Sequence, residues 1–212
     1  MQNLIFVIVL SYLLGSFPTS VVLSRLWKGI DIRDYGSKNA GATNVYRVLG
    51  IAPAIIVLLI DAFKGIGSVL WISQIGSNNL YLNMIALQLL AGASAIFGHI
   101  FPIYIGFKGG KGIGTGMGVF LALIPKEVLL ALCIFVLVVA LTRYVSLGSL
   151  CAATFISLAL IFEKYYFNVK VENELVFLTL ALTLLIFFTH RSNIKRLLKG
   201  KENKLGQKRK NF

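Results

Sequence analysis

The chain has 212 residues, of which 57% are hydrophobic and only 14% are charged, and its formal net charge is +13. A soluble domain of this size carries about 25% charged residues, so the composition excludes an ordinary soluble protein. Apolar runs near 20 residues recur along the whole length. Such runs cross ~30 Å of hydrocarbon as helices, and they are continuously apolar, which disfavours a β-barrel.

We therefore expect an all-α, polytopic integral membrane protein with a bundle of about seven transmembrane helices. The first apolar run has no basic flank and no small-residue cleavage site, which indicates a permanent span rather than a signal peptide. Residues 112–124 are short for a span and can also form a re-entrant arm paired with 127–142. The expected spans are 3–24, 51–73, 80–100, 112–124, 127–142, 146–162 and 174–190.

The basic residues predict the orientation of these spans. Loop 25–50 has five Lys and Arg, loop 101–111 has two, Arg143 stands in a turn, and the tail from Arg191 has nine. Alternate segments hold 17 basic residues on one side and three on the other, so the rich side should be cytoplasmic. The amino terminus is then outside and the carboxyl terminus is inside. This distribution also makes a nucleic-acid partner unexpected.

Polar residues gather in four segments, all on the predicted cytoplasmic side. They are GSKNAGATNVYR (36–47), HIFPIYIGFKGGKG (99–112), RYVSLGS (143–149) and HRSNIKRLLKGKE (190–202). Four such clusters at one membrane face favour a composite site. We accordingly divide the chain into a transmembrane domain with a cytoplasmic-face active site, residues 1–192, and a basic cytoplasmic tail, residues 193–212.

The chemistry of these segments favours anion binding without a metal. Arg, Lys, His, Ser, Thr and Asn are abundant, whereas the acids on this side are only Asp31, Asp34 and Glu202, with Asp61 inside a span. A magnesium-dependent phosphotransferase would need clustered carboxylates. In FKGGKG, consecutive glycines would let backbone amides converge on an oxyanion beside Lys108 and Lys111. A flexible loop with topology-setting lysines is the equal alternative, and the segment does not match a Walker A motif.

Several other polar residues have a structural interpretation as well as a functional one. Asp61 and Lys64 are three apart and can pair on one helix face, or contact substrate. His99 and His190 each stand at a predicted membrane interface, as a hydrogen-bonded structural group or as part of the site. Ser146 and Ser149 suit a helix start. Gly114 and Gly118 favour close helix packing, Cys133 and Cys151 suit small buried residues, and the tail lysines favour contact with lipid headgroups.

These four motifs, in this order and spacing, resemble the bacterial acyl-phosphate:glycerol-3-phosphate acyltransferases of the PlsY type, over essentially the whole chain. The resemblance implies a bundle of seven transmembrane helices in the bacterial cytoplasmic (inner) membrane. It implies transfer of a long acyl chain from acyl phosphate to the sn-1 hydroxyl of glycerol 3-phosphate, which gives lysophosphatidic acid and inorganic phosphate. No cofactor or metal is implied, and a monomer can work. Membrane lipids are the remaining partners.

By resemblance, the motifs assign the site residues. The catalytic set is Ser37, Arg47, Lys108, Lys111 and His190. The substrate- and phosphate-binding set is Asn39, Thr43, Asn44, Gly109, Gly110, Ser146 and Asn193. Arg47 and the two lysines would neutralise and position phosphates. Either His190 or a phosphate oxygen of the acyl donor could accept the hydroxyl proton, and phosphate is a good leaving group without protonation.

A membrane transporter or channel for organic phosphates is the competing function, because broken, glycine-rich elements and cationic sites also serve transport. Two features count against it. The polar groups gather at one face rather than along a path through the bilayer, and no inverted repeat is visible between the halves. A structural lipid-binding scaffold is a third class.

Overall fold

The structure, a computed structural model, describes residues 2–77 and 82–206, and every regular element in these ranges is a helix. The chain divides into two compact units, with the boundary between Leu123 and Ile124. The all-α expectation is therefore confirmed for the described residues. The start of the span expected at 80–100 and the end of the expected tail, residues 207–212, lie outside them.

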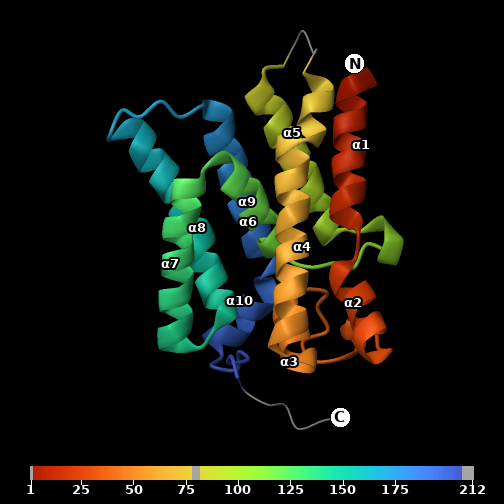
Figure 1. Cartoon of the computed structure of the whole chain (residues 1–212). Coiled ribbons are helices and arrows are strands. Elements are labelled where there is room, and N and C mark those ends of the chain that lie inside the picture. Colours follow the sequence, from red (N-terminus) through yellow and green to blue (C-terminus); the bar gives the residue numbers. More distant parts are fainter. Residues whose placement is uncertain (1, 78–81, 207–212) are drawn as a thin grey trace. The chain divides into compact units, whose positions relative to one another are not determined.

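The first unit contains six α-helices and three short 3-10 helices (Figure 1). The α-helices are α1 (Gln2–Ser16), α2 (Thr19–Lys28), α3 (Ala42–Leu49), α4 (Ile51–Leu70), α5 (Met84–Ile100) and α6 (Ile113–Leu123). The 3-10 helices are η1 (Ile32–Asp34), η2 (Ile72–Gly76) and η3 (Ile103–Ile105). Helix α1 packs along α5, and α4 packs along α6, α5 and α3.

The first expected span, 3–24, is broken in the structure between α1 and α2. Pro18 stands at the break and has no N–H to continue the helical ladder. The carbonyl oxygen of Phe17 accepts a hydrogen bond from Lys64 Nζ at 2.6 Å. A polar group of α4 thus satisfies backbone that the break exposes, as a membrane interior requires.

Close helix packing explains two of the three glycines of α6, Gly114 and Gly118. A Cβ at Gly118 would collide with the carbonyl oxygen of Ala62 on α4, and a Cβ at Gly114 would lie 3.1 Å from the Cβ of Asp61. On α4, a Cβ at Gly65 would in turn collide with the carbonyl oxygen of Thr115. The predicted packing role of Gly114 and Gly118 is confirmed, because α4 and α6 approach backbone to backbone.

We expect Gly118→Ala to destabilise the protein by about 1–3 kcal/mol, since the added methyl group must displace the backbone of α4. Gly116→Ala is the matched control. Its Cβ would meet only Ile96 Cδ1 at 3.8 Å, an ordinary contact, and alanine also favours helix by about 1 kcal/mol. Thermal unfolding of both variants in the same detergent checks this prediction. A Gly118→Ala variant as stable as Gly116→Ala would contradict it.

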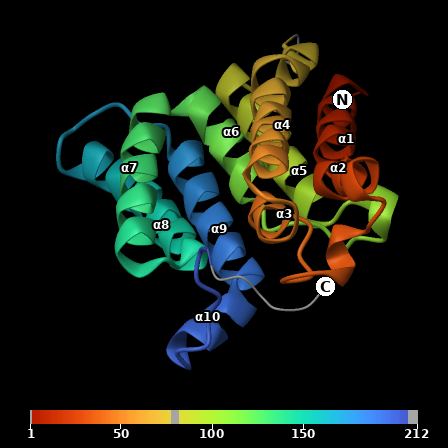
Figure 2. The ribbon, with the colours of Figure 1, turned by 60° about the horizontal axis from the view of Figure 1, so that its bottom comes forward.

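The second unit contains α7 (Pro125–Thr142), α8 (Val145–Tyr165), α9 (Asn173–Thr189) and α10 (Arg191–Leu198). Helix α8 packs against α7 and α9, and α10 leaves α9 at an angle of 61° (Figure 2). The segment after α10 remains with this unit, because Leu205 N donates to the carbonyl oxygen of Arg143 at 2.7 Å. The described part of the expected tail is therefore folded, and α10 already begins at Arg191.

By length and composition, five segments of the described residues can cross a membrane, or six if the bent α9–α10 pair counts as one span. The first of them is Asn3–Lys28, which takes α1 and α2 together, so the segment expected at 3–24 remains a candidate span despite its break. Helix α6 has 11 residues. At 1.5 Å per residue it is about 16 Å long, which is too short to cross the hydrocarbon core alone. Large apolar side chains on the long helices are exposed, as lipid-facing positions are, for example Leu59 (61%) and Phe177 (73%). A count of seven spans stays a prediction.

Candidate active site

The loop that contains the first polar motif is shaped by Asn44, whose side chain is 1% exposed. Its Nδ2 donates to the carbonyl oxygens of Ile32 and Tyr35, both at 3.0 Å, and its Oδ1 accepts from Ser37 N at 2.7 Å. A Cβ at Gly36 would collide with this Oδ1, and the φ of Gly36 is 59°. The amide of Asn44 therefore holds residues 32–37 in place, and its expected contact with substrate stays a prediction.

We expect Asn44→Ala to destabilise the protein by about 2–3 kcal/mol, because two carbonyls and one amide would lose their partner in a buried place. Activity should fall with the loss of loop shape. Thermal unfolding and turnover of the purified variant measure both. Lys38→Asn is the control, since Lys38 is exposed and has a φ of 59° that asparagine tolerates. An Asn44→Ala variant that unfolds like the control would refute this role.

The remaining candidates of the first motif lie around α3. Thr43 is in its first turn and Arg47 is in its last, one helical turn apart on one face. Ser37 and Asn39 precede the helix, and all four side chains are half-buried. This helix presents a hydroxyl and a guanidinium together, a combination that suits a phosphate group.

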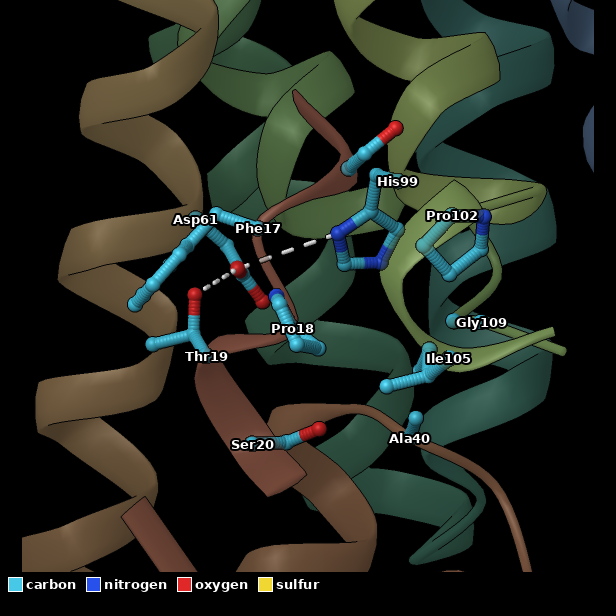
Figure 3. A pocket seen from close by; sticks show the side chains of 12 residues that line it. Phe17, Pro18, Thr19, Ser20, Ala40, Asp61, His99, Pro102, Ile105 and Gly109 are labelled. Carbon is cyan, nitrogen blue, oxygen red and sulfur yellow. Dashed lines mark hydrogen bonds and ion pairs between the residues drawn. The ribbon is translucent and has the colours of Figure 1, made fainter. Parts of the chain in front are cut away.

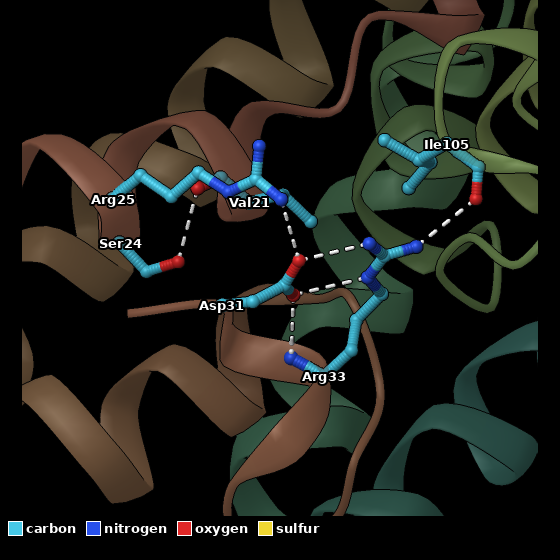
Figure 4. A network of polar contacts seen from close by, with 6 residues as sticks. All are labelled: Val21, Ser24, Arg25, Asp31, Arg33 and Ile105. Carbon is cyan, nitrogen blue, oxygen red and sulfur yellow. Dashed lines mark hydrogen bonds and ion pairs between the residues drawn. The ribbon is translucent and has the colours of Figure 1, made fainter. Parts of the chain in front are cut away.

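The first loop is defined as residues 29–41, between α2 and α3. An ionic cluster links it to η3, which precedes Gly109 and Gly110 (Figure 4). Asp31 accepts from Arg25 Nη2 at 2.9 Å and from Arg33 Nη2 at 2.8 Å, and Arg33 Nη1 donates to the carbonyl oxygen of Ile105 at 3.0 Å. The hydrogen bond from the Arg33 side chain holds the pKa of Asp31 well below its ordinary value. The cluster keeps its charge through the neutral range, so it joins η1 to η3 under working conditions.

The glycine loop, defined as residues 108–111, does not offer its glycine amides to an anion. Gly109 N donates to the carbonyl oxygen of Ile100, and Gly110 N donates to that of His99, both at 3.1 Å. In this structure the two amides are therefore bonded within the protein, and phosphate binding by this loop stays a prediction. Lys108 is exposed and Lys111 is half-buried, so the cationic side chains are what the loop can present.

A pocket lies where the two loops of the first unit approach each other (Figure 3). Ala40 of the first loop, the two glycines of the glycine loop and His99 line it, together with Asp61 and the α1–α2 break. The structure thus brings the first two polar motifs together around a common hollow. Asp61 and Lys64 pair at 2.8 Å, which confirms the ion pair expected from their spacing.

In the second unit, His190 stands at the bend between α9 and α10 and is 2% exposed. Its Nδ1 lies 2.9 Å from the carbonyl oxygen of Ile186. Since a carbonyl can only accept, Nδ1 carries the hydrogen and donates it. Whenever the ring is neutral, its lone pair is therefore on Nε2, the arrangement that a proton acceptor needs.

Glu202 organises the other two candidates of this unit. Its Oε1 accepts from Asn193 Nδ2 at 2.7 Å and from Ser146 Oγ at 3.1 Å, and its Oε2 accepts from Arg196 Nε at 2.7 Å. The predicted residues Ser146 and Asn193 are thus brought together. Glu202 itself was not a candidate from the sequence, although a single acid within a strongly basic tail is a usable signal.

Among residues 2–77 and 82–206, no group of three His, Cys, Asp or Glu side chains could hold a metal ion. The candidates fall into two sets. Residues 37–47 and 108–111 belong to the first unit, and Ser146, His190 and Asn193 belong to the second. Cations and hydroxyls dominate the first set, and a hydrogen-bonded imidazole dominates the second.

Residues 5–200 match the family model described as glycerol-3-phosphate acyltransferase. The chain belongs to the glycerol-3-phosphate acyltransferase family. Relatives of that name include one from Chlorobium phaeobacteroides (strain BS1), 42% identical over 97% of both chains. Another is from Chlorobaculum tepidum, 40% identical over the full length of both. The resemblance drawn from the four motifs is confirmed.

Solved structures of a glycerol-3-phosphate acyltransferase also match. One is PlsY (YgiH), described as an integral membrane glycerol 3-phosphate acyltransferase in its glycerol 3-phosphate form, with a TM-score of 0.83 and 34% identity over 96% of each chain. The lysophosphatidic acid form gives a TM-score of 0.81 and 33% identity over 96% of this chain and 95% of that one. This member of the family is therefore a multi-pass membrane enzyme rather than a transporter.

Proposed function

We propose that this enzyme transfers a long fatty acyl group from acyl phosphate to the sn-1 hydroxyl of glycerol 3-phosphate at the cytoplasmic membrane face. The products are lysophosphatidic acid and inorganic phosphate. The match of residues 5–200 to the acyltransferase family carries the proposal. The glycerol 3-phosphate and lysophosphatidic acid forms of PlsY support these two molecules as substrate and product here.

The chemistry is that of a mixed anhydride. The glycerol hydroxyl oxygen attacks the acyl carbon, a new C–O ester bond forms, and the C–O bond to phosphate breaks. The hydroxyl proton passes to His190 Nε2 or to a phosphate oxygen of the donor. Two phosphates side by side need positive charge, which Arg47, Lys108 and Lys111 would supply.

The other candidates would bind or position. Ser37 and Asn39 of the first loop and Thr43 of the first turn of α3 would donate to phosphate oxygens, while Asn44 holds the loop. Ser146 and Asn193 would be oriented by Glu202. Gly109 and Gly110 would let the glycine loop pass close to its neighbours. No metal or cofactor has a part in this scheme, since the residues implied by the motifs are cations and neutral donors.

The predicted orientation puts this reaction in a bacterial cytoplasmic (inner) membrane. The side with 17 basic residues faces the cytoplasm, where glycerol 3-phosphate is available. The acyl chain would lie among the spans, with its phosphate at the interface. One copy of the chain would suffice.

The test is release of inorganic phosphate by purified protein in lipid cubic phase, given palmitoyl phosphate and glycerol 3-phosphate. Phosphate and lysophosphatidic acid should form in equal amounts, only with both substrates, and a chelator should not change the rate. Palmitoyl-coenzyme A as the donor is the matched control and should give no product. No release, with phosphate movement in sealed liposomes, would overturn the proposal in favour of transport.

We expect His190→Ala to lower kcat/KM by about 10²-fold, within the range of a lost general base. If His190 accepts the proton, the wild-type rate should fall at acid pH as the imidazole charges, and the variant should lack this limb. The pH–rate profiles of the two proteins measure it. Near-normal turnover and affinity in His190→Ala would contradict any role of this side chain in the reaction.

A further inference from the structure

A buried polar chain runs from the α1–α2 break to the glycine loop (Figure 3). Lys64 Nζ donates to Asp61 Oδ1 at 2.8 Å, and Thr19 Oγ1 donates to the same oxygen at 2.9 Å. His99 Nδ1 lies 3.7 Å from this oxygen. All four side chains are less than 10% exposed. The carboxylate of Asp61 therefore lies beside one edge of the His99 ring, among side chains that are all buried.

The opposite edge of the ring faces the glycine loop. A Cβ at Gly110 would collide with His99 Nε2 and would lie 2.9 Å from the carbonyl oxygen of Ala40. A Cβ at Gly109 would collide with the carbonyl oxygen of His99. That same oxygen accepts from Gly110 N at 3.1 Å. Glycine is thus needed at 110 because the chain lies against the His99 ring, and at 109 because it lies against the His99 backbone.

We propose that His99, buried beside Asp61, is a positioning residue that sets the glycine loop against the first loop. The inference rests on the proposed function, in which Lys108 and Lys111 bind phosphate. His99 would not touch the substrates. It would fix where the two lysines of the loop stand relative to Ala40 and the residues of the first motif. The glycines at 109 and 110 would then serve packing on His99, not direct binding by their amides.

This role makes His99 and Gly110 energetically coupled, which a double-mutant cycle measures. The variants are His99→Ala, Gly110→Ala and the two together. In each single variant we expect kcat/KM to fall about 30-fold, with a raised KM for at least one phosphate substrate and weaker inhibition by inorganic phosphate. In the double variant, removal of the ring relieves the collision with His99 Nε2, while the contact of the methyl group with the carbonyl oxygen of Ala40 at 2.9 Å remains. The loss of kcat/KM in the double variant should therefore be clearly smaller than the product of the two single losses.

A merely structural His99 predicts another pattern. In that case His99→Ala would lower the unfolding temperature and the active fraction but leave both KM values and phosphate inhibition unchanged. Its loss of kcat/KM would multiply with that of Gly110→Ala to about 900-fold. That pattern would overturn the inference. His99→Gln is the second variant in case His99→Ala does not fold, and a normal KM for both substrates in it would also overturn the inference.

Two further proteins complete the design. Ser73→Ala removes a buried hydroxyl that bonds only to the carbonyl oxygen of Val69, as far as the described residues show, and it should keep wild-type KM values. Wild-type protein is assayed beside it. An inactive wild type would overturn the proposed function, whereas an active wild type with multiplicative losses would overturn this inference alone.

Discussion

Arg47→Ala should lower turnover by about 10³-fold while leaving the protein folded in the membrane. Arg47 lies in the last turn of α3 and is half-buried. If it holds a phosphate oxygen as charge moves to the leaving group, its loss removes a charge-assisted pair of hydrogen bonds. Removal of one such donor from a preorganised site typically costs 10²–10³ in rate, and a bidentate arginine gives the upper end.

The matched variants separate charge from shape. Arg47→Lys keeps the charge but loses the planar fork, so it should recover only part of the lost rate. Arg25→Ala removes an arginine whose side chain is 61% exposed and pairs with Asp31 at 2.9 Å, and its turnover should stay within about threefold of wild type because exposed pairs contribute little. Steady-state kinetics and thermal unfolding of the three variants measure this. An active Arg47→Ala variant would contradict the proposed role of Arg47 in phosphate binding.

Arg47 could be chosen from the sequence because it ends a dense polar motif between two apolar runs. The same logic found the fold class. Long apolar runs can only be satisfied as helices in a membrane, and the basic loops predict the orientation. The family followed from the order of four motifs, none of which is specific alone. Patterns of this kind are local, and so the sequence displays them.

The contacts between distant segments could not be predicted in this way. Arg33 reads as one of several basic loop residues, yet it bonds to Ile105 at 72 positions' distance. The sequence offers Asn44 as a substrate ligand, but it cannot show that the amide bonds to Ile32, Tyr35 and Ser37. The glycine loop suggests free amides, whereas its amides bond to Ile100 and His99. Which way a polar group points depends on tertiary packing, and spacing alone does not contain it.

Asp61 and Lys64 lie between these two cases. Their spacing predicted the pair, but not its burial or its links to the α1–α2 break and His99. Two charges placed in an apolar span are costly unless each satisfies the other. A pair that also bonds to Thr19 and to the carbonyl oxygen of Phe17 joins α4 to a helix break. The two charges therefore compensate each other and also hold the helix break that lines the pocket.

Lys64→Met should destabilise the protein by about 3–5 kcal/mol, because it leaves the buried Asp61 carboxylate without its cation. Both side chains are 5% exposed or less. We expect a large fall in the yield of folded protein and in its unfolding temperature. Lys126→Met is the control. Lys126 is 78% exposed and lies 3.9 Å from Glu163, so its loss should cost no more than about 0.5 kcal/mol.

The double variant Asp61→Asn/Lys64→Met tests what the charges do. Asparagine can still accept from Thr19, and no unpaired charge remains, so most of the lost stability should return. Activity should return less completely, because the carboxylate beside His99 is gone. Unfolding temperature and kcat/KM of the single and double variants measure the two effects separately. Full recovery of stability and activity would mean that the pair is only a structural ion pair. If neither recovers, the Asp61 carboxylate is needed for folding by a partner other than Lys64.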